Sequence, residues 1–160
     1  MINTDALLNI AHEAREDGNF DLARQCYERG AALGDADCLH ALAYMCAVGE
    51  GVSEDKELAM KLYRRAWRGG SHAAAFNIAI LYRKQGKAAF MFRWFKRVAL
   101  VRDGSAQFEM AKCYLDGTGV RKDPQAAIRS LVAAIQSSFI TEYEREEAQA
   151  LLHSLRPRPV

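Results

Sequence analysis

Apolar residues recur along most of the chain at the spacing of an α-helix. Apolar and small residues fall at positions i, i+3, i+4 and i+7, which share one helix face, with charged residues between them. Glycine-containing segments such as Gln85-Gly86-Lys87 interrupt the pattern and indicate turns. The pattern predicts helices at approximately residues 4–17, 20–33, 36–48, 55–68, 72–85, 87–102, 105–116 and 123–137, and a ninth near 140–155.

One segment of the pattern occurs twice, across the end of a predicted helix and the turn that follows it. Residues 42–52 (LAYMCAVGEGV) align without gaps with residues 110–120 (MAKCYLDGTGV), so that Gly49 corresponds to Gly117, 68 residues further on. The same shift aligns three further residues: Ala59, Tyr63 and Ala66 correspond to Ala127, Leu131 and Ala134. Small residues on either side of a large one predict closely packed helices with the ring filling the space between them.

Two shorter copies complete a tiling of four repeats. One opens the chain with Ile10-Ala11 and Tyr27, and the other lies between the long copies with Ile78 and Phe95. We place the repeats at approximately residues 4–34, 36–70, 72–104 and 105–137, with the ninth helix as a C-terminal capping helix. This array predicts a single helical-repeat domain over residues 1–160.

The two long copies resemble the Sel1-like repeat, a relative of the tetratricopeptide repeat. The matching residues are Leu42-Ala43, Gly49-Glu50-Gly51-Val52, Asp55, Ala59, Leu62-Tyr63, Ala66 and Gly69 in one copy, and Ala106, Met110-Ala111, Tyr114, Gly117-Thr118-Gly119-Val120, Asp123, Ala127 and Ala134 in the other. The shorter copies look closer to plain tetratricopeptide repeats. The resemblance implies a right-handed α-solenoid with a concave face lined by first helices, and scaffold or adaptor roles without catalytic residues. Cys46 and Leu131 depart from the family pattern, which has aromatic residues there.

Residues that could carry enzyme or metal chemistry lack the spacing that such chemistry needs. The chain has four cysteines and four histidines but no Cys-x-x-Cys pair, no Gly-x-Ser-x-Gly and no phosphate-binding glycine loop. Cys38 and Cys46 lie too far apart on one predicted helix to form a disulfide. His12-Glu13 lacks the second histidine of a helical zinc motif. We therefore expect no catalytic residues, no metal and no cofactor.

Basic residues are concentrated in the middle of the chain. The net charge is only +2, yet the window from Lys56 to Arg102 holds twelve Lys and Arg residues and a single acid, Glu57. This excess predicts a partner with an acidic surface, or else a solvated charged face. Two predicted helices carry the residues that we call the basic belt: Arg64, Arg65, Arg68, Arg93, Lys96 and Arg97. Nucleic acid is the weaker alternative, in which the belt neutralises phosphates and Trp67 and Trp94 stack bases.

The first-helix positions that face away from the predicted core form a candidate partner-binding surface. They are Leu8, His12, Glu16, Asp37, His40, Tyr44, Phe76, Ile80, Lys84, Phe108, Lys112 and Asp116. Five of these residues are apolar or aromatic, whereas a face that served only solubility would be polar. Exposed apolar surface mixed with polar anchors is typical of partner sites. The alternative is that the curvature of the array or the capping helix buries these side chains.

Together these features favour a non-enzymatic scaffold that binds a protein partner. Small bacterial proteins of the resembled family include immunity proteins that neutralise a toxin, and the basic belt would suit an acidic toxin surface that the protein occludes. The alternative is an adaptor in a regulatory, signalling or envelope-assembly pathway. The N-terminus shows no secretory signal, and no segment is apolar enough to span a membrane, which favours a cytoplasmic location. The oligomeric state stays open.

Overall fold

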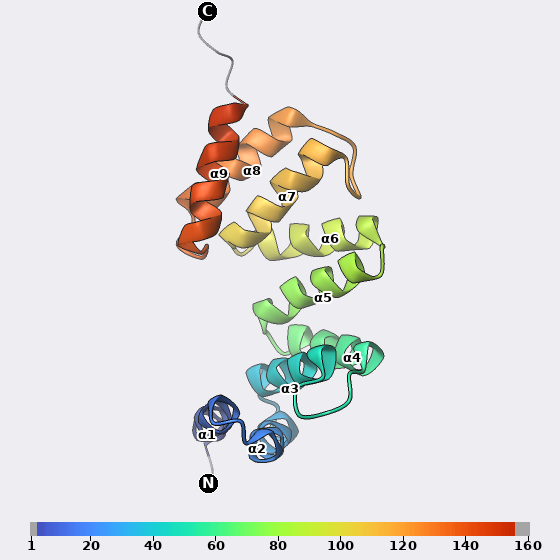
Figure 1. Cartoon of the computed structure of the whole chain (residues 1–160), viewed down its shortest axis with the longest axis vertical. Coiled ribbons are helices and arrows are strands. Elements are labelled where there is room, and N and C mark those ends of the chain that lie inside the picture. Colours follow the sequence, from blue (N-terminus) through green and yellow to red (C-terminus); the bar gives the residue numbers. More distant parts are fainter. Residues whose placement is uncertain (1–2, 156–160) are drawn as a thin grey trace, which may run out of the picture. The chain divides into compact units, whose positions relative to one another are not determined.

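The computed structural model describes residues 3–155, and this part of the chain is built from nine helices (Figure 1). They are α1 (Thr4–Glu16), α2 (Phe20–Ala32), α3 (Ala36–Val48), α4 (Lys56–Arg68), α5 (His72–Lys84), α6 (Ala88–Ala99), α7 (Gly104–Asp116), α8 (Pro124–Gln136) and α9 (Glu142–Ser154). An isolated bridge between Asp103 and Phe139 is the sole β-type pairing within residues 3–155. The predicted all-α fold of successive helical hairpins followed by one further helix is confirmed.

Predicted and observed helix boundaries agree closely, with one exception at α6. This helix was predicted to reach residue 102 and instead ends at Ala99. Arg102 has a φ of 61°, in the left-handed region, which a right-handed helix does not tolerate. The side chain of Asp103 then accepts a hydrogen bond from the Ala106 N–H and starts α7.

The helices group into two compact units, one up to Ile78 and one from Ala79, with the boundary inside α5. Each unit has its own helix contacts and its own buried residues. The single domain over residues 1–160 remains a prediction.

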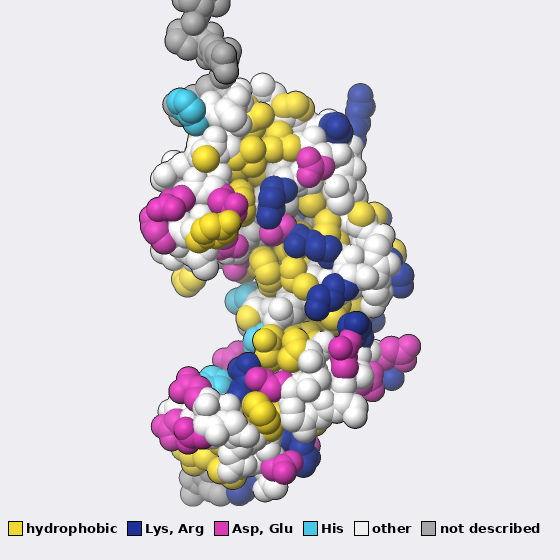
Figure 2. Space-filling model, in the orientation of Figure 1, with side chains coloured by type: hydrophobic (Ala, Val, Ile, Leu, Met, Phe, Trp, Pro, Cys, Tyr) yellow, Lys and Arg dark blue, Asp and Glu magenta, His cyan; other side chains and the backbone are white. Residues whose placement is uncertain are grey.

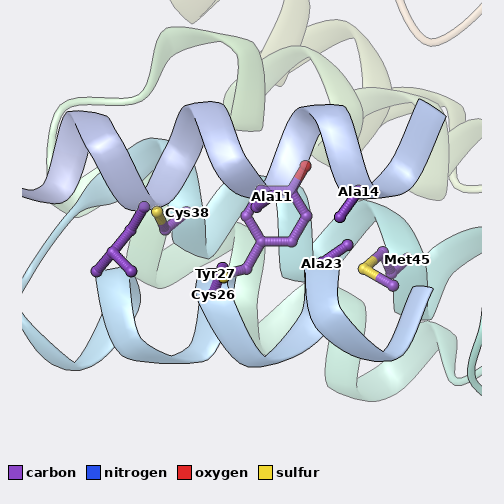
Figure 3. Packing of buried hydrophobic residues seen from close by; sticks show 8 residues of the cluster. Ala11, Ala14, Ala23, Cys26, Tyr27, Cys38 and Met45 are labelled. Carbon is purple, nitrogen blue, oxygen red and sulfur yellow. The ribbon is translucent and has the colours of Figure 1, made fainter. Parts of the chain in front are cut away.

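In the first unit, α1 packs against α2, α2 against α3, and α3 against α4. Figure 3 shows the centre of this packing, where Tyr27 lies among small side chains, including Ala11 of α1 and Ala23 of its own helix α2. Tyr27 and Tyr63 are fully buried, as the small–aromatic–small spacing predicts. The small neighbours let the helices approach while the rings fill the space between them.

In the second unit, α6 packs against α7, α7 against α8, and α8 against α9. The final helix begins with a capping box, in which Thr141 and Glu144 satisfy each other's backbone N–H groups. Its Ala148 is fully buried in a cluster with Phe108 and Leu131. The ninth helix therefore covers the last hairpin, as predicted for a capping helix.

The two Gly-x-Gly-Val turns adopt the same backbone path. Gly49 and Gly117 end α3 and α7 with φ of 74° and 77°, and each N–H donates to the carbonyl four residues earlier, at 2.9 and 2.8 Å. Asp55 and Asp123 then start α4 and α8 by accepting backbone N–H groups in the first turn. The two long copies, which lie 68 residues apart in the sequence, therefore have the same turn structure as well.

Candidate functional site

The candidate surface of the first unit starts on α1. Leu8, His12 and Glu16 lie one helical turn apart, so they share one face of this helix. His12 and Glu16 are exposed, whereas Leu8 is half-buried and packs against the core of the unit. The His12 ring meets the buried Tyr27 ring edge-on at 5.8 Å. This face therefore presents a histidine and a carboxylate above an apolar base.

The next first helix, α3, adds three side chains with different degrees of burial. Asp37 is exposed, His40 is half-buried, and Tyr44 is 36% exposed. The His40 ring packs against Tyr63 with 5.6 Å between ring centroids, so much of its surface is withdrawn from water. Tyr44 is therefore the large aromatic side chain that α3 presents to solvent.

Arg15 links α1 and α3 to the turn after α3. Its Nε donates to the carboxylate of Glu50 at 2.5 Å, and its guanidinium lies 4.8 Å from the centroid of the Tyr44 ring. The hydrogen bond to Glu50 raises the pKa of Arg15 above its ordinary value. Sequence reasoning did not single out Arg15 or Glu50, although Glu50 lies in the repeated turn and Arg15 follows His12 by one helical turn.

A polar hollow opens beside this arginine. It has a volume of about 410 Å³ and is lined by His12, Arg15, Glu16 and Glu50. Two carboxylates, a guanidinium and an imidazole thus converge on one concave surface between α1 and the turn after α3. The hollow can accept both donors and acceptors from a partner.

His40 also contacts α5. The side-chain amide nitrogen of Asn77 lies 2.8 Å from His40 Nε2, and since an amide nitrogen donates, the imidazole accepts and is neutral. Burial lowers the pKa of His40, and the nearby Asp37 carboxylate offsets part of that effect. His40 therefore joins α3 to α5 as a neutral hydrogen-bond acceptor, a role that its position on the helix did not reveal.

In the second unit, a carboxylate on α7 organises two basic side chains. Glu109 is ion-paired with Arg83 and with Lys112, the latter at 2.6 Å. Lys112 lies on the predicted face, and its Nζ is 4.5 Å from the centroid of the Phe108 ring. Arg83 and Glu109 were not predicted. The i, i+3 spacing of Glu109 and Lys112 was the available signal for the helical pair.

A second hollow of about 300 Å³ adjoins these charges. It is lined by Arg83, Met91, Glu109, Lys112, Cys113, Asp116 and Thr118. The predicted residues Lys112 and Asp116 therefore lie on one concave surface of the second unit. Its lining combines both charge signs with the sulfur atoms of a methionine and a cysteine.

The predicted exposure of Phe108 is wrong. Its side chain is 4% exposed and packs in the cluster that Ala148 of α9 completes. The reason is the capping helix, which contacts α7 as well as α8 and covers this ring. The adjoining hollow, of about 480 Å³, is lined by Lys112 and α9 residues as well as by Phe108.

The remaining predicted residues lie on α5, which the boundary between the units divides. Phe76 and Ile80 are half-buried, and Lys84 is exposed near the end of the helix. The helix is almost apolar in its first half, where Ala74 and Ala75 are fully buried. Phe76 and Ile80 are thus less accessible than the prediction of an open face required.

The six basic-belt residues are exposed, three on α4 in the first unit and three on α6 in the second. On the face shown in Figure 2, basic side chains gather over α6 and α7, and acidic ones over α9. The tryptophans near the belt do not form a stacking platform. Trp94 is buried beneath Arg97, and Trp67 is half-buried against His72. Base stacking on Trp94, part of the nucleic-acid alternative, is therefore wrong, because the ring belongs to the core.

The cysteines are free thiols, and burial raises the pKa of Cys38 to about 12 and of Cys113 to about 11. Such thiols stay protonated at neutral pH and are poor nucleophiles. Across the described helices and turns, no three His, Cys, Asp or Glu side chains converge as a metal site would require. None of the helices in residues 3–155 has the length and apolar character needed to cross a membrane.

Comparison with known proteins finds a matching family model and solved structures with the same fold. The family model described as Sel1 repeat matches residues 5–35, 36–71 and 104–129, which together make up more than half of the chain. The matched segments include the first repeat, which was predicted to be closer to a plain tetratricopeptide repeat. A comparison with curated protein sequences returns no match.

Two solved structures share the fold. A protective antigen of uropathogenic Escherichia coli that displays an SLR fold has 25% identity and a TM-score of 0.78, and the alignment covers 96% of this chain and 33% of the antigen. A Sel1 repeat protein from Oxalobacter formigenes has 18% identity and a TM-score of 0.77, with 96% and 74% covered. The chain therefore spans about a third of the length of the antigen.

The family match and the fold lead to the same assignment. Three Sel1 repeats are matched along the sequence, and the helical hairpins superpose on solenoids of that repeat class. Proteins of this kind act in general as scaffolds for protein–protein interaction. The chain belongs to the Sel1 repeat family.

Proposed function

We propose that the chain is a non-enzymatic scaffold that binds a protein partner through the first-helix surface of its first unit, with Tyr44 as the central contact. The observation that carries this proposal is the arrangement of Tyr44, Arg15 and Glu50 beside the polar hollow. Tyrosine and arginine are the residue types that dominate binding energy at protein interfaces. Here the arginine is held by Glu50, so part of the ordering cost of binding is met before the partner arrives.

The surface of the second unit supports the same proposal. Glu109 holds Arg83 and Lys112 at the rim of the second hollow, so their positive charges are oriented in the free protein. An acidic partner would meet positive charge from these two side chains and from the basic-belt residues on α6. Charge complementarity of this kind speeds encounter and selects the partner.

A narrower form of the proposal is an immunity protein that occludes an acidic toxin. Two points support it. Small bacterial proteins of the family include immunity proteins, and the middle of the chain is basic. An adaptor that serves several partners is the alternative. The two roles differ in affinity, because an immunity protein binds one partner tightly, at about nanomolar Kd or below, whereas adaptors bind several partners more weakly.

Affinity purification of the tagged protein from its native cells, followed by mass spectrometry, separates these roles. One stoichiometric partner, above all one encoded beside this chain, would support the immunity role. Several substoichiometric partners would favour the adaptor. Recovery of nucleic acid without protein would contradict the scaffold proposal altogether.

The binding surface is tested with Tyr44→Ala and Arg15→Ala. Each variant is expected to weaken partner binding by about tenfold or more with unchanged circular dichroism, since hot-spot truncations cost about 2 kcal/mol. Leu22→Ala is the matched control, because Leu22 is an exposed apolar residue on α2, outside the hollow. Equal affinity for wild type and Tyr44→Ala would show that the partner binds elsewhere.

A further inference from the structure

A second exposed surface lies at the end of α6, and it contains none of Tyr44, Arg15 and Glu50. Leu100 is 80% exposed directly after the helix, and Val101 beside it is also exposed. Phe139, in the connection between α8 and α9, is 69% exposed. Large apolar side chains exposed together in this way are typical of partner-binding sites.

Hydrogen bonds hold these two connections side by side. The Gly104 N–H donates to the Phe139 carbonyl at 2.8 Å, and the Ser137 hydroxyl donates to the Arg102 carbonyl at 2.7 Å. Figure 1 shows the α6–α7 and α8–α9 connections meeting near the start of α7. The two connections therefore form one fixed edge. We call it the α6 edge, and it consists of Leu100, Val101, Arg102 and Phe139.

The backbone at Arg102 departs from the other repeats. Gly34 and Gly70 stand two residues before the next first helix and have φ of 90° and 104°, values that suit glycine. Arg102 holds the equivalent position with a φ of 61°. A non-glycine residue in this region costs conformational energy, and such residues cluster at functional sites. The guanidinium side chain is thus kept where glycine would fit with less strain.

Arg102 also lines a hollow at the same edge. The hollow has a volume of about 330 Å³, and its lining comes from the end of α6, from α7 and from the end of α8: Ala99, Arg102, Gln107, Ala133, Gln136 and Ser137. The two glutamines can donate and accept hydrogen bonds at its wall. The α6 edge therefore combines an apolar rim with a polar, basic recess.

The charge around the α6 edge is positive on the α6 side. Arg93, Lys96 and Arg97 are exposed and share one helix face with Leu100, at spacings of i, i+3, i+4 and i+7. Neither α6 nor α8 contains an Asp or Glu residue. The carboxylates at the start of α9 are engaged, Glu142 with Arg145 at 3.5 Å and Glu144 with Ser105 at 2.7 Å.

We propose that the α6 edge is a second docking surface and that its partner is an acidic protein segment carrying an apolar anchor residue. The anchor packs on Leu100, Val101 and Phe139, and the carboxylates pair with Arg102 and with the basic face of α6. Guanidinium groups suit this role because they bind carboxylates in a bidentate geometry. This surface is separate from the first-helix surface of the proposed function, so either can fail alone.

The test pans phage-displayed random peptides on the whole protein and measures the affinity of the selected peptides by fluorescence polarisation. Selected peptides are expected to be rich in Asp and Glu beside a large apolar residue. Their affinity should fall at least about tenfold for the double variant Leu100→Ser, Phe139→Ser, and should fall when salt screens the charges. Leu33→Ser is the matched control, since Leu33 is 62% exposed in the equivalent connection of the first unit and should leave binding unchanged.

Arg102→Gly gives a readout that a merely structural role would not produce. Because glycine relieves the left-handed strain, the melting temperature should stay the same or rise while peptide affinity falls. A fall in both quantities would assign Arg102 a structural role and contradict the proposal. So would selected peptides without acidic residues, or an affinity that the Leu100→Ser, Phe139→Ser variant leaves intact.

Two other occupants are distinguished by the same variants. Concentration-dependent dimerisation that Leu100→Ser abolishes would show that a second copy of this chain covers the edge, which overturns the proposal. Displacement of a selected acidic peptide by single-stranded DNA would point to a nucleic acid instead. Neither result would affect the test on Tyr44 and Arg15.

Discussion

Polar side chains on the first-helix surfaces are held by neighbours of the same unit. Glu50 fixes Arg15 beside Tyr44, and Glu109 fixes Arg83 and Lys112. These ion pairs are partly exposed, and exposed pairs contribute little to stability, about 0–1 kcal/mol each. Their effect is on geometry, since they limit the conformations of long side chains before a partner binds.

His40 makes stability depend on pH at one residue. Its folded pKa is lowered by burial, so the neutral ring is favoured in the folded state, and protonation favours unfolding. The contribution is complete above the unfolded pKa of about 6.5 and is lost as the pH falls towards the folded value. Urea unfolding is measured at about pH 7.5 and about pH 5. On acidification, His40→Gln should lose less stability than wild type.

His12→Gln is the control for this measurement, because it removes an exposed histidine and leaves the contact between His40 and Asn77 in place. The same loss on acidification in wild type and His40→Gln would rule out His40 as the group responsible. Asn77→Ala removes the amide that donates to His40 Nε2, so it should also reduce the loss of stability on acidification.

Cys46 and Tyr114 occupy equivalent positions of the two long repeats and differ in what they fill. The Tyr114 ring packs edge-on against Phe92 at 5.2 Å, whereas Cys46 lines a largely aliphatic hollow of about 450 Å³. Tyr114→Cys should lower the free energy of unfolding by about 2 kcal/mol or more, because it removes a packed ring and its aromatic contact. Cys46→Tyr should change it by no more than about 1 kcal/mol, because the hollow has room for much of the ring.

Thermal or urea unfolding of the two variants checks this pair. Equal destabilisation by both substitutions would mean that the hollow beside Cys46 closes around the thiol in solution.

At the scale of elements, the repeated Gly-x-Gly-Val turn of each long hairpin packs against the hairpin before it. A Cβ atom at Gly51 would lie 2.3 Å from the Cβ of Phe20, and one at Gly119 would lie 2.2 Å from the carbonyl oxygen of Ala88. Both glycines also have positive φ, of 68° and 73°. Each second glycine of the motif therefore allows close packing on the start of the preceding second helix.

Gly119→Ala should lower the free energy of unfolding by about 2 kcal/mol or more, since it adds a steric clash to a left-handed backbone. Gly86→Ala is the matched control. Gly86 has a φ of 70° but open space around its Cβ position, so it should cost only about 1 kcal/mol for the backbone. Chemical denaturation compares the two, and an equal cost would show that the turn moves away from Ala88 without penalty.

At the scale of the whole molecule, the chain consists of two compact units, and the proposed binding surfaces of Tyr44 and of the α6 edge lie on different units. In repeat proteins each element contacts mainly its neighbours, so destabilisation stays local unless the interfaces couple it. Gly119→Ala should therefore raise hydrogen exchange in α7 and α8 more than in α1 and α2. Exchange that rises equally in all helices would show that the chain opens as one cooperative body.

Helix positions and packing roles could be predicted from the sequence because they depend on local spacing. The periodic small and aromatic residues identified Tyr27, Tyr63 and Phe95 as core, and all three are fully buried. The glycines of the long turns lie at the ends of α3 and α7 as predicted, and Asp55 and Asp123 cap the starts of α4 and α8. These features are encoded within about one turn of the backbone, where sequence and conformation are directly linked.

The accessible surface, by contrast, was decided by contacts between residues distant in the sequence. Phe108 is covered by α9, His40 is engaged by Asn77, and Arg15 is fixed by Glu50 from the following repeat. The left-handed Arg102 lies in the connection after α6, and the bridge between Asp103 and Phe139 joins this connection to the one between α8 and α9. A single helix pattern marks which face is apolar, but which part of that face a neighbour covers depends on the path of the whole chain, and the tertiary structure alone specifies it.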